Sequence, residues 1–270
     1  MPLVEKDAGL PPVRRFYPEF ALAQVRTRRF GGQNYSEPVR EIIGGDPSLR
    51  ADDGSADAAV SAALTAYAAG EGSERAALTA LAASRLLVPV VAVLAGEPAP
   101  AGAGEKASEM ALPTLIGLDG RRAIPAFTCL DAMRRWRPDA RPVPAAALKV
   151  WQAAAGDSCA VVVDVGGPVP LAVEGARLSA LSRGEEPPPP WADADVREAV
   201  AGALSDQLEV AGFDLRPGGA DHDLAIALRL VPARPAGDVS DLASRVAGAV
   251  LGRLGGRLRR GVAIWLDAGR

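Results

Sequence analysis

The fold is decided by residues 105–184, EKASEMALPTLIGLDGRRAIPAFTCLDAMRRWRPDARPVPAAALKVWQAAAGDSCAVVVDVGGPVPLAVEGARLSALSRG. Two apolar runs, at 110–118 and 123–129, flank the dipeptide Asp119-Gly120. Asp-Gly between two such runs favours a tight hairpin turn, because both residue types tolerate positive φ. The stretch is therefore predicted to begin with a β-hairpin.

Two helices are expected after this hairpin. The first carries Trp136 on its apolar side, has Thr128 as its predicted cap and must end before Pro138. The second is predicted to begin at Pro144, because a missing donor costs nothing in a first helical turn, and to bury Trp151. Both tryptophans are therefore expected in the core rather than in a ligand site.

A second hairpin follows these helices. Residues 161–163 are all valine, which predicts a central strand that is covered on both faces. Residues 164–168, DVGGP, are typical of a turn, and the proline-containing run through Leu171 and Val173 is expected at an edge of the sheet. The order hairpin, helix, helix, hairpin indicates a layered fold of strands and helices.

The composition sets the scale of the fold. The chain has 270 residues, which is room for one large or two small domains. Hydrophobic residues make up 49% of it and aromatic residues only 4%, so its core is expected to consist mainly of Leu, Val and Ala. We predict an α/β (α+β) protein with two small domains, each a mixed, mostly antiparallel sheet packed with helices.

Composition also divides the chain into four segments. Residues 1–52 lack periodicity and are rich in Arg, Gly and Pro, so we expect a disordered leader, with a basic docking tail as the alternative. Residues 53–184 are predicted to form the first α/β domain. Residues 185–192 contain four consecutive prolines and are expected to be an extended linker. Residues 193–270 are predicted to form the second α/β domain.

The second domain has a clear pattern of its own. Its most regular part, residues 224–230, alternates apolar and smaller or polar side chains as a half-buried strand does. We expect a small sandwich in which helices cover one face of a sheet. In chain order, a helix, two strands, a helix and a strand are expected near residues 196–204, 213–215, 224–230, 242–249 and 262–266.

Five short motifs occur in a fixed order along the chain. They are DDGSAD at 52–57, RLLVPV at 85–90, KASEMALP at 106–113, the segment from FTC at 127–129 to WRP at 136–138, and DVGGP at 164–168. This collinear series resembles the actinobacterial members of the SseB family, named after enhanced serine sensitivity. The family usually carries Ser where this chain has Cys129. The resemblance implies no known reaction, cofactor or catalytic residue.

The residue inventory offers little for catalysis. His222 is the single histidine, so a hydrolytic triad or a histidine-rich metal site lacks partners. Cys129 and Cys159 show no metal-ligand spacing and are expected to be buried thiols. The GAGEK run at 102–106 lacks the spacing and the hydroxyl of a phosphate loop. We therefore expect no catalytic residue, no cofactor and no metal.

The charges argue against nucleic acid and membranes as partners. A net charge of −3 creates no field that attracts polyanions. Arg257, Arg259 and Arg260 fall near a predicted helix C-terminus, where the dipole favours cations, so an RNA-binding patch is the weaker interpretation. Without a signal sequence or a membrane-length apolar run, the protein is expected in the cytoplasm, as a monomer or weak homodimer.

The candidate interaction surface consists of Lys106, Ser108, Glu109 and Thr128, at the mouth of the first hairpin. In the alternative interpretation, Lys106 and Glu109 form an exposed ion pair of little energetic value and Thr128 only caps a helix. We expect a non-enzymatic module that binds an unknown protein partner through the hairpin edge or the sheet face. The alternative is a small-molecule (amino-acid-like) sensor or minor enzyme with a pocket between the domains.

Overall fold

The computed structural model describes residues 22–29, 42, 45–94, 108–231, 239–254 and 256–267. The chain divides into two compact units. The first consists of Met1–Val60 and Leu81–Glu174, and the second of Ser61–Ala80 and Gly175–Arg270. Each unit combines helices with one mixed sheet, which confirms the predicted α/β class.

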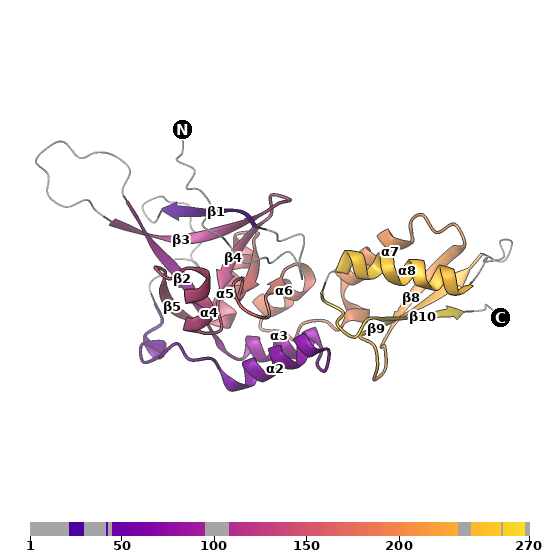
Figure 1. Cartoon of the computed structure of the whole chain (residues 1–270), viewed down its shortest axis with the longest axis horizontal. Helices are drawn as coiled ribbons and strands as arrows, with labels where there is room; N and C mark the ends of the chain where they lie inside the picture. Colours follow the sequence, from indigo (N-terminus) through magenta and orange to yellow (C-terminus); the bar gives the residue numbers. More distant parts are fainter. Residues whose placement is uncertain are drawn as a thin grey trace, which may run out of the picture. The chain divides into compact units, whose positions relative to one another are not determined.

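A seven-stranded mixed sheet forms the centre of the first unit (Figure 1). Its strand order is β5-β2-β3-β4-β6-β7, and β1 pairs in addition with β3. The pair β4–β6 is parallel, whereas the other described pairs are antiparallel. The strands are β1 (Leu22–Arg29), β2 (Arg85–Leu94), β3 (Ser108–Gly117), β4 (Arg122–Ala126), β5 (Arg141–Ala146), β6 (Ala160–Val163) and β7 (Leu171–Val173).

The two predicted hairpins are confirmed. Strands β3 and β4 pair with Leu115 opposite Ala123, and Gly120 in the turn between them has a φ of 82°, which glycine adopts without strain. Strand β6 is buried along its whole length, and the short strand β7 lies at the edge of the sheet. These elements were predictable because turn chemistry and strand pattern lie next to each other in the sequence.

Strand β1 corrects the expectation of a disordered leader. It pairs antiparallel with β3, from Leu22 opposite Gly117 to Arg29 opposite Ala111. Pairing satisfies backbone groups along β3, and composition carries no signal for such a long-range partner. The expectation of disorder therefore does not hold for residues 22–29, and most of the remaining leader lies outside the described residues.

Two helices of the first unit also test the predictions. Helix α4 (Leu130–Trp136) ends before Pro138, and helix α5 (Ala147–Gly156) ends at the predicted glycine. Pro144 does not open a helix, however, because it lies in edge strand β5, where the missing N–H of a proline is tolerated. Trp136 and Trp151 are both buried, as predicted.

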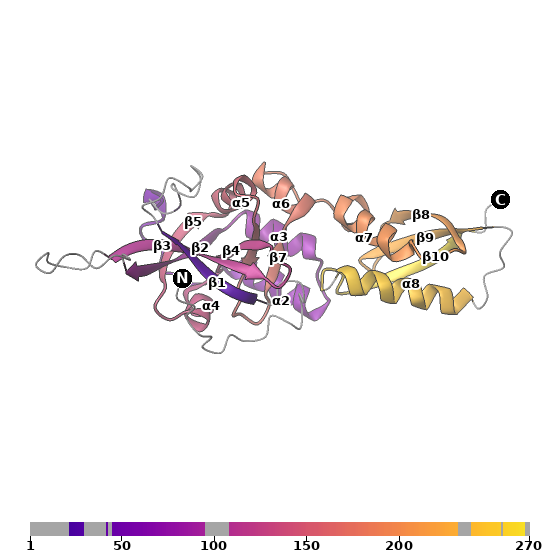
Figure 2. The same ribbon diagram turned by 90° about the horizontal axis from the view of Figure 1, so that it is seen from above.

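The second unit contains the predicted order of helix, strand, strand, helix and strand. Its three-stranded sheet has the order β10-β9-β8, in which β9 is parallel to β10 and antiparallel to β8. Figure 2 shows helix α8 running alongside these three strands. The elements are α6 (Gly175–Ser182), η4 (Pro190–Ala192), α7 (Ala194–Leu204), β8 (Val210–Arg216), β9 (Leu224–Leu230), α8 (Val239–Leu254) and β10 (Val262–Asp267).

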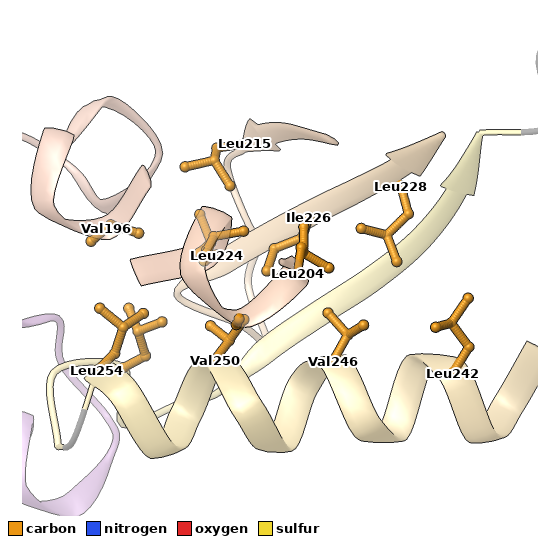
Figure 3. Packing of buried hydrophobic residues seen from close by; sticks show 13 residues of the cluster. Val196, Leu204, Leu215, Leu224, Ile226, Leu228, Leu242, Val246, Val250 and Leu254 are labelled. Atoms are coloured by element: carbon orange, nitrogen blue, oxygen red, sulfur yellow. The ribbon is translucent and has the colours of Figure 1, made fainter. Parts of the chain in front are cut away.

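Helices α7 and α8 cover one face of this sheet (Figure 3). Leucine and valine side chains repeat once per turn along the buried side of α8 and meet alternate residues of β9. On the other face of the sheet, Trp265 of β10 is 55% exposed. The prediction of a sheet covered on one face is therefore correct. The residues in contact are Leu242, Val246, Val250 and Leu254 of α8 and Leu224, Ile226 and Leu228 of β9.

The proline-rich segment is not a linker between the two units. Pro189 has the extended backbone expected of consecutive prolines, with φ −67° and ψ 156°. However, residues 185–192 lie inside the second unit, together with residues 61–80 and 175–184 that were assigned to the first domain. Arg75 Nε donates to the carbonyl of Pro187 at 3.0 Å, which anchors the segment to helix α3 (Glu74–Ala82).

Four buried charged side chains connect the segments of the second unit. Arg177 donates to Glu74 at 2.5 Å, and Arg257 donates to Glu74 at 3.2 Å and to Asp193 at 2.6 Å. Burial disfavours the Arg257 cation, but Glu74 and Asp193 together raise the pKa of Arg257 above its ordinary value. The interpretation of Arg257 as a cation at a helix end was therefore incomplete, because its partners come from distant segments.

Arg257→Met should lower the free energy of unfolding by about 3–5 kcal/mol, because Glu74 and Asp193 would stay buried without this cation. Urea unfolding followed by circular dichroism measures the change. The matched control is Arg229→Met, because Arg229 pairs with Asp214 at 2.5 Å but its side chain is 50% exposed. The control should cost about 0–1 kcal/mol, and equal losses in the two variants would contradict the assignment.

Candidate functional site

The carboxyl ends of β4 and β6 lie side by side at the same end of the first unit's sheet, because the two strands are neighbours and run parallel. Thr128 follows β4, and Asp164 follows β6. The Thr128 backbone N–H donates to Asp164 Oδ1 at 2.8 Å, and the Thr128 hydroxyl donates to Oδ2 at 2.7 Å. Both residues are buried. Asp164 therefore fixes Thr128 through two hydrogen bonds.

The backbone at Asp164 belongs to a tight turn. Its φ is 51°, in the left-handed region that Asp tolerates better than most residues. The N–H of Gly167 donates to the Asp164 carbonyl at 2.7 Å, and a Cβ on Gly167 would come within 2.9 Å of the Asp164 Cβ. Burial raises the pKa of Asp164 above its ordinary value, although the bonds from Thr128 and the charge of Arg135 oppose this effect.

Arg85, at the start of β2, connects Thr128 to a loop far away in the sequence. Its Nη1 donates to the Thr128 carbonyl at 2.5 Å, and its Nε donates to Asp52 Oδ2 at 2.6 Å. Its Nη2 donates to the Ser55 carbonyl. One guanidinium therefore donates to three oxygens. Its planar group presents several N–H donors in fixed directions, which the single ammonium of a lysine does not.

The loop held by Arg85 forms one wall of a pocket of about 450 Å³. Asp52 Oδ1 accepts the Gly54 N–H at 2.8 Å, and the Gly54 carbonyl accepts the Leu130 N–H at 2.8 Å, which joins the loop to α4. Leucine and proline make up half of its lining residues. The lining residues are Gly45, Asp46, Pro47, Leu49, Arg50, Asp52, Asp53, Gly54, Leu87, Leu130, Pro142 and Pro144.

Two carboxylates in this lining are ionised well below neutral pH. Hydrogen bonds from Ser48 lower the pKa of Asp46, and hydrogen bonds from Ser55 lower the pKa of Asp53. Arg50 contributes a positive charge to the same lining. The pocket therefore combines apolar side chains with fixed charges of both signs, which suits binding rather than proton transfer.

Three of the four residues of the predicted interaction surface lie among the described residues. Lys106 lies outside the described residues. Ser108 and Glu109 begin strand β3, where their backbones pair with Leu94 and Val93 of β2. Thr128 is buried and bonded to Asp164, so it offers no exposed surface for a partner.

Thr128 also does not cap helix α4, in contrast to the prediction. Cys129 occupies the N-cap position, and its Sγ accepts the Ala132 N–H at 3.4 Å. A serine at this position, as is usual in the family that the motifs resemble, has the hydroxyl that caps helices most often. Cys159 is buried as predicted, whereas Cys129 is half-buried.

The sequence reasoning named several of these residues within motifs but missed that they build a pocket. Asp46 is followed by Pro47 and Ser48, and an Asp before Pro and Ser is a signature for the start of a short helix, here η3 (Pro47–Leu49). Arg85 was visible as a charged residue directly before an apolar strand. Neither signal shows that the segment after Asp46 and the strand after Arg85 line one pocket together with residues of α4 and β5.

Metal-ligand clusters and membrane-spanning helices are both absent from the described residues. In the described ranges, no group of three or more His, Cys, Asp and Glu side chains is arranged to hold a metal ion. None of the helices described is long and apolar enough to cross a membrane.

Comparison with known proteins identifies the segment that contains most of these contacts. Residues 60–180 match the family model of the SseB protein N-terminal domain. This segment therefore belongs to the SseB N-terminal domain family. No curated protein and no solved structure matches the chain. The resemblance found from the motifs is therefore confirmed.

Four of the five motifs are joined by hydrogen bonds next to the pocket. Arg85, Thr128 and Asp164 come from three of them and are linked by hydrogen bonds. Asp52 comes from the DDGSAD motif, which precedes the matched segment but is bonded to it through Arg85. The motifs thus mark one connected structure rather than separate sites.

Asp164→Asn tests the charge state of the buried carboxyl. Because the folded pKa of Asp164 is raised, this residue stabilises the wild type most below its ordinary pKa of 3.8 and loses that contribution as the pH rises. The unfolding free energy of Asp164→Asn relative to wild type should therefore increase from pH 4 to pH 7 in urea titrations. Asp139→Asn is the control with the opposite trend, because Arg137 lowers the pKa of Asp139. If the difference in unfolding free energy between Asp164→Asn and wild type does not change with pH, the pKa of Asp164 is not raised in the folded protein.

Proposed function

We propose that this SseB-family protein is a non-enzymatic binding module that holds a side chain of a protein partner in the pocket of its first unit. The observation that carries the proposal is the pocket itself. Leu49, Leu87 and Leu130 contribute apolar side chains to its lining, and Asp46 and Asp53 contribute carboxylates. Pockets that bind a partner's anchor residue combine these two features.

The sheet edges favour the pocket over strand addition. Pro142 of β5 lies opposite Pro89 of β2, so this pair cannot exchange N–H···O bonds. Hydrogen-bonded and non-hydrogen-bonded residue pairs alternate along an antiparallel ladder. Pro144 and Leu87 lie two positions along from Pro142 and Pro89, so they also form a non-hydrogen-bonded pair. The backbone nitrogens of both β5 prolines therefore face the open edge of the sheet. Because a proline nitrogen carries no hydrogen, neither can donate a hydrogen bond to a partner strand.

The hairpin edge that was expected to bind a partner is occupied in part. Strand β1 pairs with β3 from Ala111 to Gly117. A partner strand would have to displace β1 to reach this part of β3. Binding through side chains in a pocket needs no such displacement.

The pocket chemistry supports binding without turnover. Among the described residues, the side chains that line it are Asp, Arg, Leu and Pro, with no hydroxyl, thiol or imidazole. A general base acts best when its pKa is near the working pH, whereas the pKa values of Asp46 and Asp53 are lowered. We propose a cytoplasmic protein, monomeric or weakly dimeric, whose partner is a protein rather than nucleic acid or membrane.

A small, amino-acid-like ligand is the second candidate. A volume of about 450 Å³ falls within the range of small-molecule pockets, and the lining carries charges of both signs. An amino acid that raises the melting temperature of the wild type, but not of a pocket-blocked variant, would favour this candidate.

Leu49→Arg provides the test, because it replaces an apolar side chain of the pocket lining with a long charged one. Peptides selected from a displayed random library on the full chain should bind this variant at least about tenfold more weakly in calorimetry, as expected for an anchor contact.

Leu118→Arg is the matched control. Leu118 is 61% exposed in the β3–β4 turn and does not line the pocket, so binding should stay unchanged. Selected peptides that bind Leu49→Arg as tightly as wild type would refute pocket-based recognition, and so would a selection that yields no binder.

A further inference from the structure

We propose that Asp164, which does not line the pocket, is its positioning residue and sets the pocket wall through Thr128 and Arg85. The inference rests on the proposed function, because it concerns the same pocket. It names the residues on which the shape of the site depends, and each link is a hydrogen bond between described atoms.

The first link fixes Thr128 from the side of the sheet. Both carboxylate oxygens of Asp164 are used by Thr128, one by its N–H and one by its hydroxyl. The Asp164 N–H donates in turn to the Ala126 carbonyl at 2.9 Å, at the end of β4. The end of β4 therefore holds Asp164, and Asp164 in turn orients Thr128, which follows β4.

The second link passes from Thr128 to Arg85. The peptide unit before Thr128 is held through its N–H, so the rotation of the residue is restricted and its carbonyl points at Arg85 Nη1, 2.5 Å away. This carbonyl is one of three acceptors that fix the plane of the guanidinium. Without it, the orientation of Arg85 would depend on Asp52 and Ser55, which belong to the loop that Arg85 has to hold.

The third link sets the wall of the pocket. Arg85 binds the loop at Asp52 and Ser55, and between them Gly54 donates to Asp52 and accepts from Leu130. The φ of Gly54 is 76°, and a Cβ there would lie 3.0 Å from the Leu130 Cβ. The loop therefore approaches α4 closely, and a small shift of Arg85 changes the distance between these walls.

Hydrogen exchange of the full chain tests the chain of contacts without any ligand. Asp164→Gly keeps the left-handed backbone but removes the carboxylate, whereas Asp164→Asn keeps an acceptor for the Thr128 N–H. In Asp164→Gly, the amides of Gly54 and Leu130 should exchange about tenfold faster, the size expected from losing a hydrogen bond to a charged group. Asp164→Asn should restore slow exchange.

Val163→Ala is the control for a loss of stability alone. Val163 is fully buried in β6 beside Asp164 but makes none of these hydrogen bonds, so its truncation weakens the core of the same strand. If the exchange of Gly54 and Leu130 rises as much in Val163→Ala as in Asp164→Gly, Asp164 has only a structural role and the inference fails. Unchanged exchange in Asp164→Gly would also overturn it.

Peptide affinity separates this inference from the proposed function. With peptides selected on the wild type, Asp164→Gly should weaken Kd about tenfold and Asp164→Asn should retain it. Faster exchange in Asp164→Gly together with unaltered peptide affinity would support the contact chain but refute its role in binding. If the Gly54 and Leu130 amides of Asp164→Gly exchange slowly but the peptides bind this variant more weakly, the chain of contacts is refuted and the pocket remains a binding site.

Discussion

The first unit of this protein depends on one guanidinium group with three acceptors. Arg85 joins the loop around Asp52 and Ser55 to Thr128 at the end of a central strand. Each partner alone is an ordinary surface or loop group, but together they determine where the loop lies and hence that a pocket exists. A planar cation is suited to this role because its donors point in fixed directions and it stays charged at all relevant pH values.

The second unit uses the same chemistry in a more buried form. Arg177 and Arg257 share Glu74, and Arg257 also binds Asp193, so two cations and two carboxylates balance in the interior. Such clusters contribute little net stability compared with apolar packing, but they strongly disfavour arrangements that leave one charge unpaired. The ion cluster thus specifies how the segments of the second unit meet, while apolar side chains of α7, α8 and β9 supply most of the hydrophobic cluster that covers its sheet.

The sequence predicted the elements whose signals are local. The Asp119-Gly120 turn, the buried valines of β6 and the alternation in β9 each place their cause within a few residues of their effect. Strand β1, edge strand β5 and the pocket were missed, because each depends on a partner that is distant in the chain and leaves no periodic pattern. The family motifs gave the residues of the site but not their contacts, since similarity of order says nothing about which side chains meet.

The order of the units along the chain has a consequence for synthesis. Leu81–Glu174 of the first unit interrupts the second, whose two parts lie on either side of it. Glu74 and Arg257 are 183 residues apart, so a ribosome needs roughly 10–40 s between making the one and making the other. For that interval the nascent chain carries helix α3 without the cation that completes its buried charge balance.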